Sequence, residues 1–179
     1  MGRIQPGQKL LINGAGGGVG TFAIQIAKAH EVEVTAVDSP GKLDMLRSLG
    51  ANHVIDYTRE DCTKTGERYD LILDVKTKRS LFDYARALRP NGVYVTVGGS
   101  TSQLPSALLV AWWVSMTENK HIRLVTLKAN KDLEYLKDLF EAGNVVPVID
   151  GPYALCDLPD AFRHFGEARH QGKVVIAVE

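Results

Sequence analysis

The residues whose types and spacing best suit chemistry are five glycines within the seven residues 14–20. They follow a short apolar run at residues 10–12 and precede apolar residues at helical spacing, namely Val19, Phe22, Ala23, Ile26 and Ala27. This order predicts a buried strand, a tight turn and a helix whose N-terminus faces the end of the strand. The unpaired amides of a first helical turn and the helix dipole both favour an anion, so the turn is a candidate phosphate-binding site.

The spacing of these glycines is looser than the common dinucleotide-binding pattern. The motif G-x-G-x-x-G is absent, and Gly14, Gly17 and Gly20 instead give G-x-x-G-x-x-G. Flexible turns also collect glycine, so the cluster alone leaves a purely structural turn open. The preceding strand, the following helix and an acidic residue further along the chain together favour a nucleotide site.

That acidic residue is Asp38, which closes a second apolar run at residues 32–37 and lies 18 residues after Gly20. A carboxylate at the end of the second strand can accept hydrogen bonds from both hydroxyl groups of an adenosine ribose. Alternatively, Asp38 begins a turn at residues 38–41, whose composition is ordinary turn chemistry. The two roles are compatible, and the position of Asp38 favours the binding role.

Four runs in this order, at residues 14–20, 49–57, 92–99 and 172–176, resemble the medium-chain dehydrogenase/reductase superfamily. The similarity is greatest to its quinone-oxidoreductase-like branch, in the cofactor-binding domain of the zinc-binding dehydrogenases, and it covers nearly the whole chain. The resemblance implies an NAD(P)-binding Rossmann fold. In this superfamily a GroES-like catalytic domain comes first, and residues 1–8 resemble the entry to the cofactor domain. We therefore expect a cofactor-binding half that lacks its catalytic domain.

The resemblance also implies a set of binding residues. It places Gly17, Gly18 and Val19 along the pyrophosphate, and Asp38 beside the adenosine ribose. It places the turn after the fifth strand near the nicotinamide, and Lys173 towards the phosphate end of the cofactor. The cofactor-binding residues expected in this way are Gly14, Gly17, Gly18, Val19, Asp38, Ser39, Lys42, Tyr57, Val97, Gly98, Gly99 and Lys173.

The choice between NADPH and NADH depends on the end of the second strand. In the resembled branch, relatives that favour NADPH carry small residues there and a lysine four positions on, which Lys42 matches. Tyr57 matches an aromatic residue often found beside the 2′-phosphate. Asp38 opposes NADPH, because a carboxylate repels a nearby phosphate by about 1 kcal/mol in water and by more in a partly buried site. If Asp38 faces the ribose, NADH is favoured; if it turns outward to cap the next helix, Ser39 and Lys42 can hold NADPH. The sequence slightly favours NADPH.

Other candidate residues have an ordinary interpretation. Lysines are most often exposed, and this alternative applies to Lys42. Lys76 follows the fourth predicted strand in a basic turn, where solvated side chains are a better interpretation than a phosphate site. The pair Trp112 and Trp113 is better explained as core or subunit contact than as a substrate wall.

Composition excludes several classes of function. The chain has 179 residues, which fits one domain of ordinary size with a real core. Lys+Arg and Asp+Glu both number 21, so a general nucleic-acid or acidic-membrane binder is not expected. No apolar run approaches the ~20 residues that span a bilayer, and no signal peptide opens the chain. Two isolated cysteines and five histidines give no metal-ligand spacing, and we expect a cytoplasmic protein without a metal site.

Strand and helix patterns alternate along the chain. The expected strands are residues 10–12, 32–37, 53–55, 69–75, 93–97, 122–127 and 173–178. Helices are expected after residue 19, over residues 42–49, from 81 to a stop at residues 90–92, over 132–142 and after residue 157. This alternation predicts a doubly wound parallel α/β sheet. We expect a dinucleotide-binding domain at residues 1–150, and a C-terminal helix and strand at residues 151–179 that would pack on the catalytic domain.

No acid–base pair, nucleophile or metal cage emerges, so no catalytic residue is predicted. We expect the cofactor-binding domain of an NAD(P)H-dependent oxidoreductase that transfers hydride to a quinone, enone or other carbonyl compound. The chain alone should bind dinucleotide with little or no turnover, and a homodimer is possible. A non-catalytic NAD(P)-sensing or assembly module and an S-adenosylmethionine-dependent methyltransferase are the alternatives.

Overall fold

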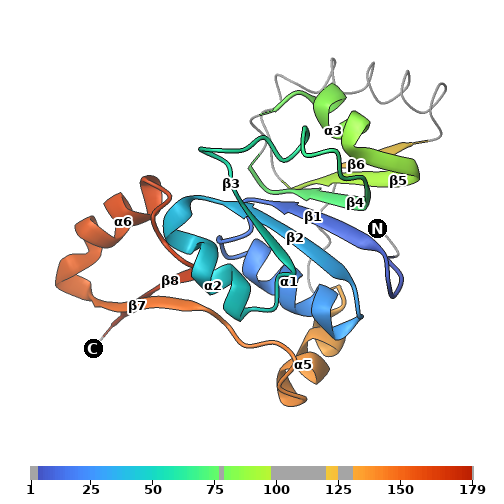
Figure 1. Cartoon of the computed structure of the whole chain (residues 1–179). Helices are drawn as coiled ribbons and strands as arrows, with labels where there is room; N and C mark the ends of the chain where they lie inside the picture. Colours follow the sequence, from blue (N-terminus) through green and yellow to red (C-terminus); the bar gives the residue numbers. More distant parts are fainter. Residues whose placement is uncertain (1–3, 77–78, 98–119, 125–130, 179) are drawn as a thin grey trace.

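The computed structural model describes residues 4–76, 79–97, 120–124 and 131–178. Its centre is a six-stranded parallel sheet with the strand order β3-β2-β1-β4-β5-β6 (Figure 1). The strands are β1 (Lys9–Asn13), β2 (Glu33–Asp38), β3 (His53–Asp56), β4 (Tyr69–Asp74), β5 (Leu88–Thr96) and β6 (His121–Leu124). Strand order reverses between β1 and β4, which is where open α/β sheets bind ligands at their carboxyl ends. The predicted doubly wound fold is confirmed.

Both faces of the sheet are buried, as unbroken apolar strands require. Leu10 and Ile12 of β1 join one core, which includes side chains of α1 and α2, whereas Leu11 joins a second core with side chains of α3. Successive side chains of a strand point to opposite faces, so α1 and α2 cover one face and α3 covers the other. These helices are α1 (Gly20–Ala29), α2 (Leu43–Ser48) and α3 (Leu81–Ala87).

The buried face of α1 differs from the predicted stripe. Its buried residues are Gly20, Thr21, Ile24 and Ala27. Val19, predicted to lie on the apolar face, is 42% exposed. Phe22 packs its ring against Phe140 of α5 (Leu133–Glu141), with the ring centroids 5.9 Å apart. The apolar residues of α1 therefore serve two contacts, one with the sheet and one with α5.

The predicted stop of α3 at residues 90–92 is wrong. The helix ends at Ala87, and Leu88 already has extended backbone angles and pairs with Tyr69 of β4. Arg89 precedes a proline, which disfavours helical backbone, and Asn91 adopts a positive φ of 63°. These local restraints lie beyond Leu88, so the earlier end of the helix follows from the pairing of Leu88 with Tyr69; the β4–β5 ladder has a register irregularity between Tyr69 and Leu71.

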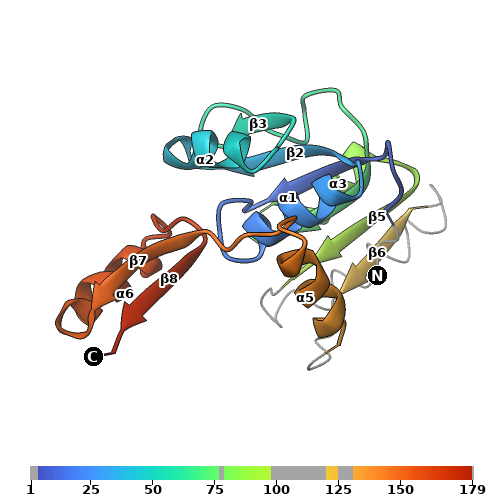
Figure 2. The ribbon, with the colours of Figure 1, turned by 90° about the horizontal axis from the view of Figure 1, so that it is seen from below.

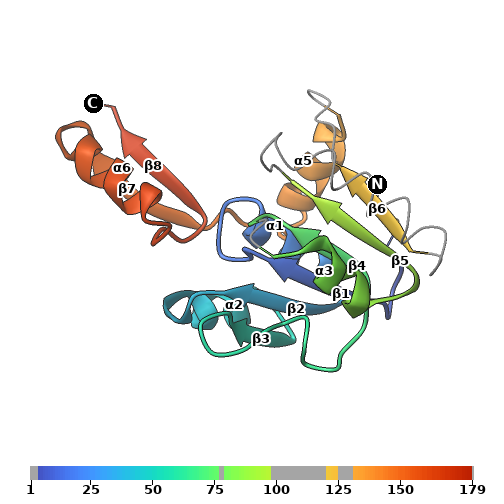
Figure 3. The same cartoon turned by 90° about the horizontal axis from the view of Figure 1, so that it is seen from above.

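The C-terminal residues form a unit of their own. A two-stranded parallel sheet, β7 (Ile149–Ala154) and β8 (Lys173–Ala177), is connected through the short helix η3 (Leu155–Asp157) and α6 (Leu158–Gly166). This β7–α6–β8 unit projects from the six-stranded sheet in all three views (Figures 1, 2 and 3). It exposes large apolar side chains at Ile149, Leu155, Phe162, Phe165 and Val178. The boundary expected after residue 150 lies within β7.

Some predicted features lie outside the described residues. They include Gly98, Gly99, Trp112, Trp113 and the end of the strand expected at 122–127. In the part of the chain that the structure describes, no helix is both long and apolar enough to cross a membrane.

Candidate functional site

The glycine turn between β1 and α1 depends on two glycines for its backbone path. Gly14 has a φ of +79°, a conformation that side-chain-bearing residues rarely adopt. Its amide and that of Ala15 donate to the carbonyl oxygen of Val37 at 3.0 and 3.1 Å, which ties the turn to β2. A Cβ at Gly20 would lie 2.4 Å from the carbonyl oxygen of Ala15, so α1 can approach the turn only with glycine at this position.

Gly17 is different, because no atom of the described residues fills the space where its side chain would lie. The nearest heavy atom to a Cβ built at Gly17 is the carbonyl oxygen of Gly14, at 3.9 Å. Gly17, Gly18 and Val19 lead directly into α1. In its first turn, the amides of Thr21 and Ala23 already donate to the carbonyl oxygens of Gly17 and Val19, both at 3.0 Å, so an anion at this N-terminus would meet the amides of the turn itself. The turn therefore leaves room at the point where a helix N-terminus attracts an anion.

Asp38, at the end of β2, turns its carboxylate towards the glycine turn. Oδ2 accepts the amide of Gly16 at 2.7 Å, and Oδ1 accepts the amide of Ser39 at 2.8 Å. The Nζ of Lys42 lies 3.7 Å from Oδ1. Of the two orientations considered from the sequence, the outward one, which would cap the following helix, is wrong. The side chain is 11% exposed and holds β2 and the glycine turn together.

Lys42 is buried, with only 4% of its side chain exposed, so the expectation of an ordinary surface lysine is also wrong. Burial lowers the pKa of Lys42, the nearby charge of Asp38 counteracts this, and Lys76 lowers the pKa further. The aliphatic part of Lys42 crosses the glycine turn, since a Cβ at Gly16 would lie 2.5 Å from its Cδ. A partly desolvated cation therefore lies against the candidate anion site.

Two further lysines border the turn. Nζ of Lys173, at the start of β8, lies 2.7 Å from the position of a Cβ built at Gly18, and Cγ of Lys76 lies 2.8 Å from one built at Gly14. Among the described residues, neither lysine forms an ion pair. The sequence predicts Lys173 as a binding residue but Lys76 as a solvated one. The contact of Lys76 with Gly14 cannot be read from sequence, because it depends on how the loop after β4 folds back.

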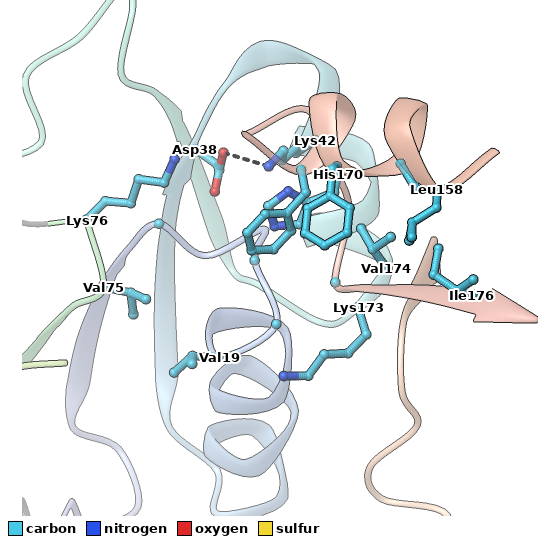
Figure 4. A pocket seen from close by; sticks show the side chains of 17 residues that line it. Val19, Asp38, Lys42, Val75, Lys76, Leu158, His170, Lys173, Val174 and Ile176 are labelled. Carbon is cyan, nitrogen blue, oxygen red and sulfur yellow. Dashed lines mark ion pairs between the residues drawn. The ribbon is translucent and has the colours of Figure 1, made fainter. Parts of the chain in front are cut away.

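A cavity of about 590 Å³ opens between the glycine turn and the β7–α6–β8 unit (Figure 4). One wall is polar and contains Asp38 with the three lysines described above. The other wall is apolar and comes from α6 and β8, with Leu158, Ala161, Phe162, Phe165, Val174 and Ile176. This wall was not predicted, because no sequence pattern indicates that α6 faces the glycine turn. The cavity thus joins the candidate anion site to an apolar surface.

The predicted binding residues fall into three groups. The structure brings together around the cavity Gly14, Gly17, Gly18, Val19, Asp38, Lys42 and Lys173. Ser39 and Tyr57 contact Asp38 through their backbone amides, at 2.8 and 3.3 Å, but they do not line the cavity. Val97 follows β5 with its amide bonded to the carbonyl oxygen of Asp74 at 3.0 Å, away from the cavity wall. Gly98 and Gly99 are not described.

Sequence reasoning missed the role of Asp74, the buried carboxylate at the carboxyl end of β4. It is 0% exposed and accepts hydrogen bonds from Asn13 Nδ2 at 2.8 Å, Tyr94 Oη at 2.6 Å and the amide of Lys76 at 3.2 Å. These donors come from the ends of β1 and β5 and from the loop after β4. Asp74 therefore fixes the switch point and the start of the loop that carries Lys76. The sequence did offer one signal for this role of Asp74, namely an acidic residue at the end of an apolar strand.

The decisive comparison is with protein families. Residues 49–176 match the family described as zinc-binding dehydrogenase. The chain belongs to that family. The resemblance noted from sequence motifs is confirmed, and membership sets aside the methyltransferase alternative.

Individual proteins with related sequences support this family assignment. The chain is 34% identical over 174 residues to 2-methylene-furan-3-one reductase of Solanum lycopersicum, covering 95% of this chain and 40% of that protein. It is 31% identical over 192 residues to the mitochondrial NAD(P)H oxidoreductase RTN4IP1 of Mus musculus, covering 96% of this chain and 48% of that protein. The chain therefore spans about half the length of these relatives.

A solved structure shows the same fold. The quinone oxidoreductase from Coxiella burnetii superposes with a TM-score of 0.84 at 24% identity, covering 99% of this chain and 55% of that one. The fold of this family member is thus that of a known oxidoreductase over its full described extent.

The family description includes zinc, so we tested whether this chain's residues fit that metal. Catalytic and structural zinc sites use three or four histidine, cysteine or carboxylate ligands. Within the described ranges, no group of three or more such residues could hold a metal ion. Cys62 is buried, and burial raises its pKa to about 11, which disfavours the thiolate that zinc requires. The described part of this zinc-binding dehydrogenase domain therefore does not fit zinc.

Proposed function

We propose that this chain is the cofactor-binding domain of an NAD(P)H-dependent oxidoreductase. The full enzyme would reduce a quinone, an enone or another carbonyl compound, or interconvert an alcohol and a carbonyl. The dinucleotide supplies the hydride for such chemistry, and the chain supplies binding and orientation. The reductase and oxidoreductase names of the relatives support this proposal.

One observation carries the proposal: the open space at Gly17, flanked by three lysines at the switch point of the sheet. The backbone of Gly17 is held by its bridge to Gly172 and by the bonds that Thr21 donates to its carbonyl oxygen, yet the space where a side chain would lie stays open to a ligand. A diphosphate at this turn would lie against the N-terminus of α1 and beside the charge of Lys173. The residues present therefore fit a dinucleotide.

For the choice of dinucleotide, the surroundings of Asp38 favour NADPH. A carboxylate has about four acceptor positions, and those of Asp38 already serve two amides and lie beside Lys42. The hydroxyl of Ser39 also lies 3.4 Å from Oδ1, so only part of this acceptor capacity remains for the ribose hydroxyls that NADH would offer. Burial lowers the pKa of Lys42, and the charge of Lys76 lowers it further, whereas Asp38 and Asp150 oppose the shift. A 2′-phosphate would relieve the repulsion between the two lysines.

The exposed apolar residues of the β7–α6–β8 unit support a proposal for its partner. We assign residues 151–179 to packing on a catalytic domain, with residues 1–150 as the dinucleotide-binding domain. Phe162 is 67% exposed, and Phe165 is 55% exposed although it stacks on His170; two such exposed neighbouring aromatic residues are typical of a surface that another domain covers. Hydride acceptance would need that partner, so the chain alone should show little turnover. The homodimer and the cytoplasmic location remain predictions; a relative named as mitochondrial shows that the family is not confined to one compartment.

Calorimetric titration of the 179-residue chain with NADPH, NADH and S-adenosylmethionine tests the proposal. We expect saturable binding of NADPH, weaker binding of NADH and no heat from S-adenosylmethionine. Folding is checked by circular dichroism in the same sample. If folded protein binds neither nicotinamide dinucleotide at millimolar concentration, the proposal is wrong. Light scattering before and after addition detects a change in oligomer, which would favour the sensing module.

A further inference from the structure

His170 lies in the cavity wall without any assigned role. It follows α6 and precedes β8, and its ring stacks on Phe165 with centroids 4.6 Å apart and an interplanar angle of 20°. Its Nδ1 is buried, and it has no hydrogen-bond partner among the described residues. Nδ1 has no accessible surface, so a ligand in the cavity would reach the ring at its other nitrogen, Nε2, for which no hydrogen bond is found among the described residues. A half-buried imidazole with neither nitrogen paired in the described part of the chain, in a cavity wall beside Lys42, is suited to bind a ligand there.

The position of His170 places it at the adenosine end of the cavity. Its neighbour Gln171 donates from Nε2 to the carbonyl oxygen of Gly41 at 3.3 Å, which links the start of β8 to the turn after β2. That turn carries Lys42, which also borders the cavity (Figure 4). Lys173, in contrast, lies over Gly18 at the helix N-terminus. His170 therefore accompanies the ribose-side cation, and Lys173 accompanies the diphosphate side.

The charged and titratable groups around His170 leave it neutral. Burial lowers its pKa, and Lys42 from the turn after β2 and Lys76 from the loop after β4 lower it further, as does His164 of α6 to a small extent. Asp150 of β7 opposes this shift. However, Asp150 already accepts from His164 Nε2 at 2.9 Å, and also from Tyr153 Oη at 2.7 Å and the amide of Gln171 at 2.9 Å.

We propose that His170 determines specificity for NADPH by taking up a proton from solvent and donating a hydrogen bond to the 2′-phosphate. This inference rests on the proposed function and deepens it. A phosphate dianion beside an imidazole favours the charged ring, whereas the ribose hydroxyl of NADH has no such effect. Binding of NADPH is therefore accompanied by proton uptake that binding of NADH lacks.

The linkage has a definite sign. In the free protein the pKa of His170 lies below 6.5, so near neutral pH the ring is deprotonated; a bound phosphate raises that pKa. NADPH affinity then increases as pH falls from about 8 to about 6.5, by at most about tenfold per pH unit for one proton. NADH affinity stays level over the same interval, because no new charge approaches the ring.

The test is calorimetric titration of the 179-residue chain near pH 7 in two buffers of different ionisation enthalpy. The difference in apparent heat gives the number of protons taken up with each dinucleotide. We expect greater uptake with NADPH than with NADH, and loss of the excess in His170→Gln. His53→Gln is the matched control, because His53 is 62% exposed, pairs with Glu33 and does not line the cavity.

Each outcome bears on the inference. Equal proton uptake with both dinucleotides overturns the role of His170 but leaves the proposed function intact. Excess uptake that persists in His170→Gln also overturns it. Failure of folded protein to bind either dinucleotide overturns both. If His170→Gln does not fold, His170→Asn replaces it, and equal proton uptake with the two dinucleotides on the unmodified chain still overturns the inference without any variant.

Discussion

The carboxylate of Asp38 accepts a hydrogen bond of 2.7 Å from the backbone amide of Gly16. This bond joins the end of β2 to the glycine turn between β1 and α1. Because Lys42 lies 3.7 Å from the same carboxylate, its buried charge is held directly over the turn. One acidic side chain therefore sets both the shape of the turn and its electrostatic character.

Replacing Asp38 by asparagine should shift the preference further towards NADPH. Asparagine keeps an oxygen acceptor for the Gly16 amide but removes the negative charge next to the proposed phosphate. Relief of about 1 kcal/mol or more of repulsion should raise the NADPH-to-NADH affinity ratio about fivefold or more. The two dissociation constants are measured by calorimetry. Asp56→Asn is the control, since Asp56 ends the neighbouring strand and is the register partner of Asp38 but does not line the cavity. An unchanged ratio in Asp38→Asn would contradict the charge argument.

Gly20 should tolerate no side chain. A Cβ there would lie 2.4 Å from the backbone oxygen of Ala15, so Gly20→Ala should lower the free energy of unfolding by about 1–3 kcal/mol or more. Gly41→Ala is the matched control because no atom lies within 4 Å of its Cβ position, and it should change stability by less than about 1 kcal/mol. Urea unfolding monitored by circular dichroism compares the two. Similar losses in both variants would show that the α1 contact is not the constraint.

The two cysteines should differ in reactivity. Cys62 is 0% exposed, and its pKa is raised to about 11, whereas Cys156 is exposed. Alkylation of the folded chain near pH 8 should therefore modify Cys156 and leave Cys62 protected until the protein unfolds. Mass spectrometry with and without urea measures this. In Cys156→Ser, rapid labelling of the native protein would contradict the burial of Cys62.

Stability should fall at alkaline pH. The ordinary pKa of a cysteine thiol is 9.0, so Cys62 loses its proton in the unfolded chain at a lower pH than in the native protein. Its contribution to stability is therefore complete below about pH 9 and decreases towards about pH 11. A shift of about two pKa units corresponds to at most about 2–3 kcal/mol. Burial also raises the pKa values of Tyr69, Tyr84 and Tyr94, which act in the same direction. Urea unfolding across this interval should show a smaller slope in Cys62→Ala; an equal slope would exclude Cys62 as a source.

Much of the fold followed from apolar periodicity. The almost unbroken apolar run at residues 93–97 predicted a strand covered on both faces, and the alternation of strands with helices predicted their parallel order. The end of α3 was wrong because a pairing of Leu88 with Tyr69, distant in sequence, outweighs the local helical pattern. The prediction that one apolar face of α1 packs on the sheet was incomplete, because Phe22 packs instead against Phe140 of α5, which is remote in the sequence.

The residues of the candidate site also fall into those that the sequence could predict and those that depend on tertiary packing. Residues tied to a motif, such as Gly14, Gly17 and Asp38, could be predicted, because the backbone and the strand end place them. The burial of Lys42 and the contact of Lys76 with Gly14 depend on tertiary packing, so composition indicates neither. His170 could not be predicted as a site residue, because it lines the cavity only when α6 and β8 pack beside the glycine turn.

Dinucleotide binding at the glycine turn requires the open space at Gly17, and the substitution Gly17→Ala tests this requirement most directly. The nearest atom to the new methyl group would be 3.9 Å away, so the free energy of unfolding should stay within about 1 kcal/mol of the unmodified chain. The same methyl group would occupy the position proposed for the diphosphate. Calorimetric titration with NADPH should show affinity reduced about tenfold or more, a loss of about 1.4 kcal/mol, while Gly166→Ala, with no atom within 4 Å, should bind normally. Undiminished NADPH affinity in a folded Gly17→Ala protein would contradict the central claim.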